Sequence, residues 1–186
     1  MWAYLWPAAQ VLAELVATEL APRVRGRAVI ELGCGLGAVG LAAARAGAEV
    51  TLTDGNPEAL ALAEANAREN DLTVRTLPLE WARVPDALAG AFDVLLGSDV
   101  SYSPDSTVEL VGAIDTLLAA GGEAWLSHPA RVYGSVLHAA ANRAKLTVEH
   151  VRTIAEGPRL PTSDDSDDRP IHVYCVRRNL SPTSHV

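Results

Sequence analysis

The sequence predicts an α/β fold, a doubly wound seven-stranded sheet that is mostly parallel and ends in a C-terminal antiparallel hairpin. Two observations carry this prediction. Short apolar runs alternate with segments rich in Ala and Leu, which is typical of parallel strands joined by helices that cover both faces of a sheet. The last two apolar runs have no helical segment between them, so they must pair as antiparallel neighbours.

Strands are expected where short runs of apolar and β-branched residues are bounded by turn residues. The predicted strands are Ala28–Leu32, Glu49–Thr53, Thr73–Leu77, Phe92–Gly97, Glu123–Ser127, Leu146–Ile154 and Ile171–Arg177. The predicted helices are Pro7–Leu20, Ala38–Ala46, Pro57–Asn70, Ser106–Ala119 and Arg131–Lys145. Asn56 before Pro57 indicates a helix N-cap followed by proline in the first turn. We expect Gly121 and Gly122 to end the helix over 106–119.

The length of 186 residues and the hydrophobic content of 49% favour one domain with its own core. We expect this domain over 1–180, with an N-terminal helical segment (1–26), a core (27–180) and a frayed tail (181–186). No apolar run reaches the ~18 residues of a membrane span, and the N-terminus lacks the pattern of a signal peptide. Two distant cysteines suggest no disulfide framework, so we expect a cytoplasmic protein.

The formal net charge of −8 argues against a nucleic-acid partner, because no basic patch is available to contact phosphates. An acidic surface would tolerate a basic or cationic partner. The segment 161–170 carries four aspartates against one arginine, and we expect a solvated loop there that weakly favours a cationic substrate. No spacing of His, Cys and Asp suggests a metal site.

A glycine-rich turn follows the first predicted strand. The segment Gly35–Gly40 fits the G-x-G-x-x-G pattern of nucleotide-binding loops, in which glycines let the backbone approach a ligand. Asp54 ends the second predicted strand, where a carboxylate can accept hydrogen bonds from ribose hydroxyls. Taken alone, these features suit both NAD and S-adenosylmethionine (SAM).

Glu31, directly before the loop, favours SAM. In a dinucleotide fold the pyrophosphate lies at the helix N-terminus after the first strand, and a carboxylate there would repel it. SAM has no phosphate and carries an ammonium and a sulfonium. The chain also lacks the second nucleotide-binding half of a dehydrogenase. A glycine turn over a buried acid without any ligand is the third interpretation.

These motifs resemble those of the class I, seven-β-strand SAM-dependent methyltransferases, which have a Rossmann-like fold. The loop Glu31–Gly37 matches E/D-x-G-x-G-x-G, and the acid after strand two and the terminal hairpin match as well. Three further segments resemble the protein-lysine methyltransferase branch, which acts on chaperones and on the β subunit of electron-transfer flavoprotein. They are Leu5–Ala9 (W-P/D-A-A), Leu79–Trp81 (L-x-W) and Gly97–Tyr102 (G-A/S-D-x-x-Y).

The resemblance implies SAM as cofactor, S-adenosylhomocysteine as product, and two groups of site residues. The cofactor-binding residues would be Trp6, Glu31, Gly33, Gly35, Gly37, Asp54, Trp81 and Ser98, and the catalytic residues Asp99 and Tyr102. An indole against adenine is a sensible role for Trp81. Packing is the alternative for both tryptophans, and a turn or N-cap role is the alternative for Asp99.

Asp99 and Tyr102 follow the carboxyl end of the fourth predicted strand, where ligands bind in open α/β sheets. Methyl transfer is a one-step displacement, so the protein mainly supplies alignment and electrostatics. A lysine amine, with a pKa of about 10.4, is mostly protonated at pH 7 and must lose a proton. A carboxylate and a phenol together can hold the amine in line and help remove the proton. Asp99 would orient the amine, and Tyr102 would line the transfer channel.

We therefore expect a SAM-dependent N-methyltransferase that acts on a lysine of a protein. A small-molecule N- or O-methyltransferase and a non-catalytic module with the same fold are the alternatives. Methyltransferases that modify bases resemble one another in carrying N/D-P-P-Y/F after strand four, where this chain has 98–102, Ser-Asp-Val-Ser-Tyr. The chain also departs from the lysine branch, because Ser103-Pro104-Asp105 follows the tyrosine where an acid often follows directly.

Overall fold

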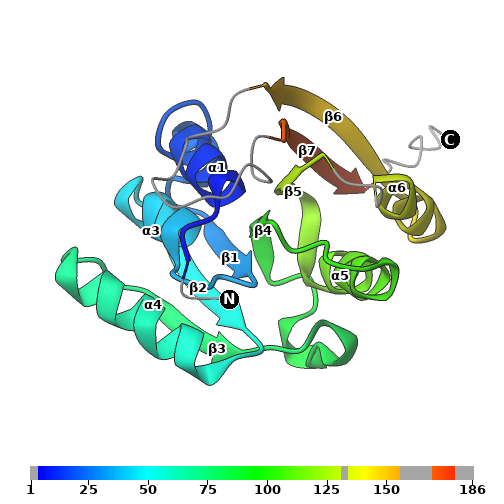
Figure 1. Ribbon diagram of the computed structural model, residues 1–186. Coiled ribbons are helices and arrows are strands. Elements are labelled where there is room, and N and C mark those ends of the chain that lie inside the picture. Colours follow the sequence, from blue (N-terminus) through cyan, green and yellow to red (C-terminus); the bar gives the residue numbers. More distant parts are fainter. Residues whose placement is uncertain (1–3, 131–133, 156–168, 179–186) are drawn as a thin grey trace, which may run out of the picture.

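A computed structural model describes residues 4–130, 134–155 and 169–178, and it contains one sheet of seven strands between two layers of helices (Figure 1). The strands are β1 (Ala28–Leu32), β2 (Glu49–Asp54), β3 (Arg75–Pro78), β4 (Phe92–Ser98), β5 (Leu118–Pro129), β6 (Leu146–Ile154) and β7 (Ile171–Arg178). They lie in the order β3-β2-β1-β4-β5-β7-β6. Only β7 runs antiparallel to its neighbours β5 and β6, so the predicted doubly wound sheet with a terminal hairpin is confirmed.

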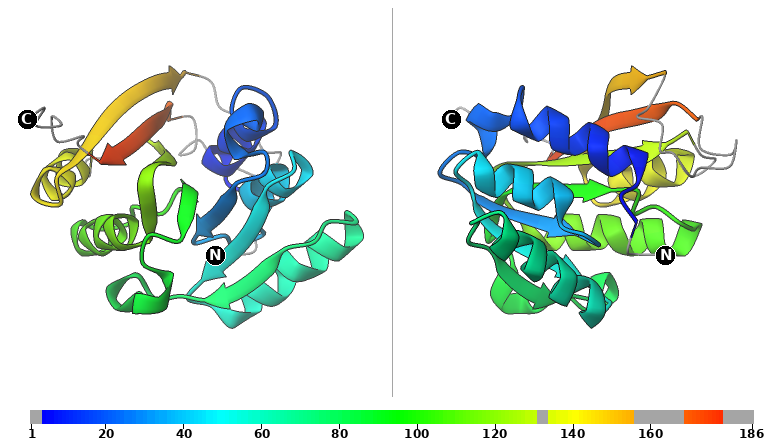
Figure 2. Two further views of the ribbon diagram at one scale, coloured as in Figure 1. Left: turned by 180° about the vertical axis from the view of Figure 1, so that it is seen from behind. Right: turned by 60° about the vertical axis from the view of Figure 1, so that its left-hand side comes forward.

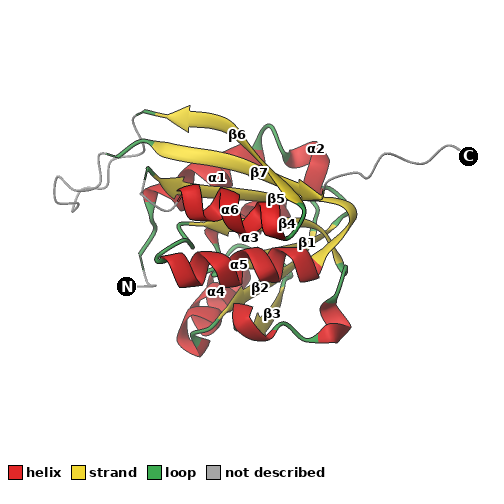
Figure 3. Ribbon diagram, turned by 90° about the vertical axis from the view of Figure 1, so that its right-hand side faces the viewer, coloured by secondary structure: helices red, strands yellow, loops and turns green. Residues whose placement is uncertain are grey.

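The helices divide between the two faces of the sheet (Figures 1 and 2). They are α1 (Pro7–Ala17), α2 (Ala21–Val24), α3 (Ala38–Arg45), α4 (Pro57–Glu69), α5 (Pro104–Leu117) and α6 (Gly134–Arg143), with the 3₁₀ helices η1 (Trp81–Arg83) and η2 (Asp86–Leu88). Helices α1, α3 and α4 pack on one face, and α5 and α6 cover the other, which is the face turned to the viewer in Figure 3. No helix in the described ranges combines the length and apolar character needed to cross a membrane.

The core has two layers, one on each face of the sheet, and the alternating side chains of each strand contribute to both. In β1, Val29 packs with α1 and α3, whereas its neighbours Ile30 and Leu32 pack with α5, and all three are fully buried. Successive side chains of a strand point to opposite faces, so a parallel strand covered on both faces reads as a continuous apolar run. Burying each such side chain stabilises the fold by roughly 1.5–3 kcal/mol.

The helices that follow β2 and β4 begin at side-chain caps. Asn56 accepts a hydrogen bond from the backbone N–H of Glu58 at 2.9 Å, as the Asn-Pro pair predicted. At α5, Ser103 and Ser106 form a reciprocal capping box, so the helix begins at Pro104, two residues before the predicted start. Such caps contribute about 1 kcal/mol each. Both fix the direction in which the chain leaves the carboxyl edge of the sheet.

The prediction for Gly121 and Gly122 was wrong. Helix α5 ends at Leu117 and β5 begins at the next residue, so both glycines lie inside the strand. The register between β4 and β5 shifts there, since Phe92 pairs with Leu118 but Val94 pairs with Glu123. Gly121 has a φ of +77°, and a Cβ on Gly122 would lie 2.7 Å from the Asp93 carbonyl oxygen. The glycines thus form a bulge that admits a close backbone approach, which is their other common use in strands.

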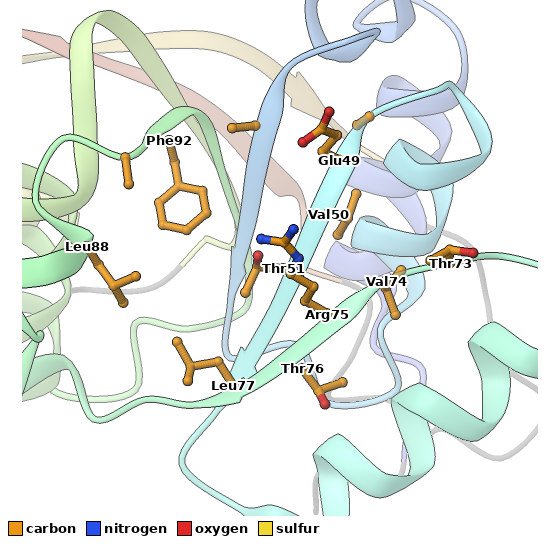
Figure 4. A pocket seen from close by; sticks show the side chains of 13 residues that line it. Glu49, Val50, Thr51, Thr73, Val74, Arg75, Thr76, Leu77, Leu88 and Phe92 are labelled. Carbon is orange, nitrogen blue, oxygen red and sulfur yellow. The ribbon is translucent and has the colours of Figure 1, made fainter.

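The connection from β3 to β4 contains η1 and η2 instead of an α-helix, and a hollow of about 770 Å³ lies beside it (Figure 4). Its lining includes the first residue of each of the four strands β1 to β4, namely Ala28, Glu49, Arg75 and Phe92. Leu88 of η2 closes one side. The hollow therefore lies at the amino edge of the sheet, whereas the predicted site residues follow the carboxyl ends of the strands.

Candidate active site

The loop between β1 and α3 depends on glycine. Gly33, Gly35 and Gly37 have φ values of +66°, +51° and +78°, a region that residues with a Cβ rarely adopt. A Cβ on Gly33 would lie 2.8 Å from the Val100 side chain in the loop after β4. The backbone of this loop is consequently free to approach a ligand from the carboxyl edge of the sheet.

Asp54, the last residue of β2, is bonded to this loop. Its Oδ2 accepts the N–H of Gly35 at 3.0 Å, and its Oδ1 accepts the N–H of Asn56 at 2.9 Å. These bonds hold the half-buried carboxylate in one orientation. Each carboxylate oxygen can accept more than one hydrogen bond, so both can still receive a hydroxyl group of a bound ligand. The arrangement suits a ribose.

A hollow of about 60 Å³ gathers most of the predicted site residues at this edge. Of the predicted residues, it is lined by Trp6, Gly33, Gly35, Asp54, Ser98 and Tyr102. They come from four separate parts of the chain: the N-terminal segment, the glycine loop, the end of β2, and the end of β4 with the loop after it. Because four segments converge on one small hollow, we expect a ligand site here rather than an isolated turn.

The Glu31 side chain does not lie where the charge argument for SAM placed it. Its side chain is 1% exposed and points beneath the loop, where Oε2 accepts the N–H of Gly40 in α3 at 2.8 Å, and it does not line the hollow. Burial raises the pKa of this carboxyl to about 8, so it is mostly protonated at neutral pH. Glu31 shares a face with Val29, which explains its direction. Glu31 would therefore support cofactor binding indirectly, by holding the loop and α3 in place, and would not contact the cofactor itself.

Gly37 and Trp81 lie next to the hollow without lining it. Gly37 is the left-handed N-cap residue of α3. Trp81 begins η1 and packs against the layer of α5, and a Cβ on Gly33 would lie 3.4 Å from its Cζ2 atom. The indole is therefore beside the glycine loop, and its stacking on adenine stays a prediction.

Asp99 directly follows β4 in a strained conformation. Its φ is +50°, its side chain is 4% exposed, and its N–H donates to the Ser127 carbonyl oxygen of β5 at 2.7 Å. A non-glycine residue in this region costs about 1–3 kcal/mol and persists only where the surroundings impose it. Asp71 and Lys145 have similar φ values away from the hollow, and Asp99 follows Ser98 without lining the hollow itself, so its catalytic role stays a prediction.

Tyr102 and the residues around it form a braced loop. The Ser101 and Thr107 hydroxyls lie 2.5 Å apart, and Thr107 also donates to the Ser103 carbonyl oxygen. Tyr102 itself is 59% exposed and lines the hollow. The loop thus holds an aromatic side chain at the boundary between the hollow and solvent, where an incoming substrate would meet it.

Sequence reasoning missed several residues of the site. Tyr4 lines the hollow and packs its ring edge-on against Trp6, with centroids 4.8 Å apart. Asn66 of α4 donates to the Leu36 carbonyl oxygen at 3.0 Å and so supports the glycine loop. Ser127 donates to the Ala8 carbonyl oxygen at 2.8 Å and fixes α1 to β5. The spacing of Tyr4 and Trp6, two residues apart, was the only signal that pointed to any of these.

The family model described as lysine methyltransferase matches residues 2–137 of this chain. The chain belongs to the lysine methyltransferase family. This match contains the glycine loop and the three segments of the narrower resemblance, from Leu5–Ala9 to Gly97–Tyr102, whereas the terminal hairpin lies outside it. The narrower resemblance to the protein-lysine methyltransferase branch is therefore confirmed.

Curated relatives agree with this assignment. Protein N-lysine methyltransferase METTL21A of Danio rerio is 31% identical over 190 residues, which cover 97% of this methyltransferase and 79% of that protein. Calmodulin-lysine N-methyltransferase of Arabidopsis thaliana is 33% identical over 62% of this chain and 40% of that protein. Histone-arginine methyltransferase METTL23 of Homo sapiens is 32% identical over 62% of this chain and 63% of that protein. The last two matches span less than two thirds of those relatives.

Solved structures confirm the Rossmann-like fold of this methyltransferase. Magnesium protoporphyrin IX methyltransferase from Synechocystis, solved with bound SAM, has a TM-score of 0.71 at 18% identity over 93% of this chain and 80% of that one. A ribosomal protein L11 methylase from Lactobacillus delbrueckii has a TM-score of 0.69 at 20% identity over 92% and 79%. The family makes this chain a SAM-dependent enzyme, and the glycine cradle with Asp54 fits that cofactor.

Proposed function

We propose that this methyltransferase transfers a methyl group from SAM to the side-chain nitrogen of a lysine in a protein. The observation that carries the proposal is Asp99, a buried acid held in a left-handed conformation at the end of β4, next to the hollow lined by the glycine loop and Asp54. Membership of the lysine methyltransferase family and the two lysine-modifying relatives support a protein acceptor.

The residues that would hold the cofactor are those that line the hollow. The backbone of Gly33 and Gly35 leaves room for it, Asp54 accepts the ribose hydroxyls, and Trp6 covers it from the N-terminal segment. SAM supplies a methyl group on a sulfonium, ready for displacement. What the protein adds is alignment of the acceptor, which can account for a large part of the acceleration of such reactions.

Asp99 aligns the acceptor in this scheme. Its carboxylate accepts a hydrogen bond from the lysine nitrogen and so directs the nitrogen lone pair at the methyl group. The lysine must arrive as, or become, a neutral amine, since the ammonium has no lone pair. The surplus proton leaves toward solvent on the side of Tyr102, which is 59% exposed. Tyr102 forms the wall along which the aliphatic part of the lysine enters.

The surface of the enzyme is compatible with a cationic protein segment. Tyr102 lies at the opening of the hollow, and the formal charge of the chain is −8. The acidic segment over 161–170, which weakly suggested a cationic substrate, lies almost wholly outside the described residues. Both cysteines are buried free thiols, and we place the enzyme in the reducing cytoplasm for that reason.

Arginine is the second candidate acceptor, because the histone-arginine methyltransferase METTL23 of Homo sapiens has about the same identity to this chain as the lysine-modifying relatives, although over 62% of the chain against 97% for METTL21A of Danio rerio. Lysine and arginine would interact with Asp99 in different ways. The lysine ammonium is a compact point charge, whereas the arginine guanidinium is planar and presents its donors in a fixed geometry. A small-molecule amine is a third candidate that the cofactor half of the site would serve equally well.

One assay separates these acceptors. A cell lysate is incubated with methyl-labelled SAM and the enzyme, and the products are resolved by gel electrophoresis and then hydrolysed to amino acids. We expect a labelled protein band that yields methyl-lysine and is absent with Asp99→Ala. Methyl-arginine would move the acceptor to the second candidate, and label only in the small-molecule fraction to the third. No label in any fraction would refute the enzyme assignment.

A further inference from the structure

Two histidines of the terminal hairpin lie close together on the face covered by α6. His150 belongs to β6 and His172 to β7, and Nε2 of the first lies 3.3 Å from Nδ1 of the second. Their ring centroids are 5.1 Å apart, and their planes are inclined by 76°. The Thr153 hydroxyl lies 3.0 Å from the His150 nitrogen and 2.9 Å from the His172 nitrogen. Three polar atoms of three side chains thus form a compact triangle.

The hairpin register fixes this triangle. Thr153 and His172 are cross-strand partners, and His150 pairs with Tyr174, two residues further along β7. The register shifts between His150 and Arg152, which brings the His150 ring back toward His172. The site is therefore built into the backbone pairing and does not depend on a mobile rotamer alone.

The spacing matches that of two ligands on one metal ion. Imidazole nitrogens bind zinc at 2.0–2.1 Å, and two nitrogens 3.3 Å apart then subtend an angle of about 105° at the ion, close to tetrahedral. If both nitrogens point at that ion, the ring centroids lie about 5 Å apart. The observed centroid separation is 5.1 Å. Two nitrogens that pointed straight at each other would instead place the centroids about half an ångström further apart.

We propose that His150 and His172 form a two-histidine site for a divalent first-row transition-metal ion, with the Thr153 hydroxyl and water completing its coordination. Imidazole ligands suit Cu²⁺, Ni²⁺ and Zn²⁺, with Cu²⁺ bound most tightly, and they disfavour Mg²⁺ and Ca²⁺. The bound ion would join β6 to β7.

The site belongs to the weaker class of metal sites. Within the ranges that the structure describes, no group of three or more His, Cys, Asp or Glu side chains is arranged around one ion. Two imidazoles and a hydroxyl leave the remaining positions to water, and both rings are reachable from solvent. Exchange of the ion with the surroundings should thus be possible without unfolding.

The test uses enzyme without an affinity tag, titrated with CuCl₂ and with ZnCl₂ by calorimetry. We expect one ion per chain, and a melting temperature that rises with the concentration of the ion. His150→Ala and His172→Ala should each weaken binding at least about tenfold. His138→Ala is the matched control: this histidine lies near the same Tyr174 ring, at 6.2 Å, but outside the pair, and its loss should leave the affinity unchanged.

Electron paramagnetic resonance of the Cu²⁺-loaded wild-type enzyme gives an answer that does not depend on the folding of any variant. Superhyperfine coupling to two imidazole nitrogens would support the site. No stoichiometric binding, a spectrum without imidazole nitrogens, or equal affinity in wild type and both alanine variants would overturn the proposal. MgCl₂ should produce neither heat nor stabilisation, and equal responses to all divalent ions would also overturn it.

Discussion

The two edges of the sheet differ in ways that led us to place the chemistry at the carboxyl edge. At the amino edge lies the larger hollow, of about 770 Å³, together with ion pairs such as Arg23–Glu123, Arg27–Asp93 and Arg178–Asp115. At the carboxyl edge lies a hollow of about 60 Å³. Size alone would therefore select the amino edge, which is not where the predicted site residues lie. The smaller hollow has what the larger lacks: backbone in left-handed conformations and polar groups converging from four segments of the chain.

The carboxylates of the two edges are also used differently. At the amino edge, Asp93 accepts a backbone N–H of β1 and pairs with Arg27, so its bonds serve the fold. At the carboxyl edge, both oxygens of Asp54 accept backbone N–H groups of loops, and the residue lines the hollow. The first arrangement closes a structural junction, whereas the second leaves acceptor capacity for a ligand. Substitutions matched across the two edges test this difference.

The largest effect is expected at Asp99. Asp99→Ala should lower kcat by about 10²–10⁴-fold, the range typical of a group that positions and deprotonates an acceptor. The affinity for S-adenosylhomocysteine, measured by calorimetry, should stay within about twofold, because Asp99 acts on the acceptor. Asp86→Ala in η2 is the control, and its turnover should equal that of wild type. Equal turnover in Asp99→Ala would remove this residue from the mechanism.

A smaller effect is expected at Asp54. Asp54→Ala removes acceptors of ribose hydroxyls and should weaken S-adenosylhomocysteine binding by about 1.5–3 kcal/mol. Asp93→Ala is the matched change at the other edge: it breaks a bond to β1 and an ion pair, so it should lower the melting temperature without affecting cofactor affinity. Cofactor affinity that falls equally in both variants would show that the two edges do not differ as proposed.

Two glycines with almost equal φ values should respond differently to substitution by alanine, because only one of them is sterically crowded. Gly33 (+66°) and Gly90 (+64°) both impose strain on an alanine, but only at Gly33 would the new Cβ lie 2.8 Å from Val100, while at Gly90 nothing lies within 4 Å. Gly33→Ala should therefore be less stable than Gly90→Ala by about 1–3 kcal/mol, the usual range for overpacking. Denaturant unfolding of the two variants measures this difference. Equal losses of stability in the two variants would mean that the loop after β4 moves aside at no cost in free energy.

The last effect is a pH dependence from Glu31, which is modest per pH unit but accumulates over a wide pH range. Its folded pKa of about 8 lies above the ordinary value of 4.5, so the protonated carboxyl is favoured by the fold. This contribution is complete below about pH 4.5 and is lost as pH rises toward 8. Relative to Glu31→Gln, the wild type should lose up to about 1.4 kcal/mol of unfolding free energy per pH unit in that window. Parallel stability curves for the two proteins would show that the carboxyl is ionised when folded.

Local sequence was enough to predict most of the sheet. The bounds of β1 and β6 were correct to the residue, because each is a run whose composition changes sharply at both ends. The bulge at Gly121 and Gly122 was missed, since a glycine pair can either end a helix or admit a close backbone approach. Only the position of the Asp93 carbonyl oxygen, a feature of tertiary packing, distinguishes these two outcomes.

The site was predictable in part for similar reasons. Motif spacing identified Asp54 and the glycines, because strand ends and left-handed turns have local signatures. The direction of the Glu31 side chain depends on which face of β1 packs against α3. The proximity of His150 to His172 depends on the register between β6 and β7. Neither can be read from the residues themselves. The hydrogen bonds from Asn66 to Leu36 and from Ser127 to Ala8 join residues that lie 30 and 119 positions apart in the sequence. No local pattern encodes such contacts.

The bond from Ser127 to Ala8 has a consequence for synthesis on the ribosome. Helix α1 can settle on α3 early, but the hydrogen bond that fixes its N-terminal end must wait for a residue made 119 positions later. At about 5–20 residues per second, this delay is on the order of ten seconds. During that interval the N-terminal end of α1, which directly follows Trp6, lacks this hydrogen bond. The nascent chain should thus acquire its cofactor late, after β5 has left the exit tunnel.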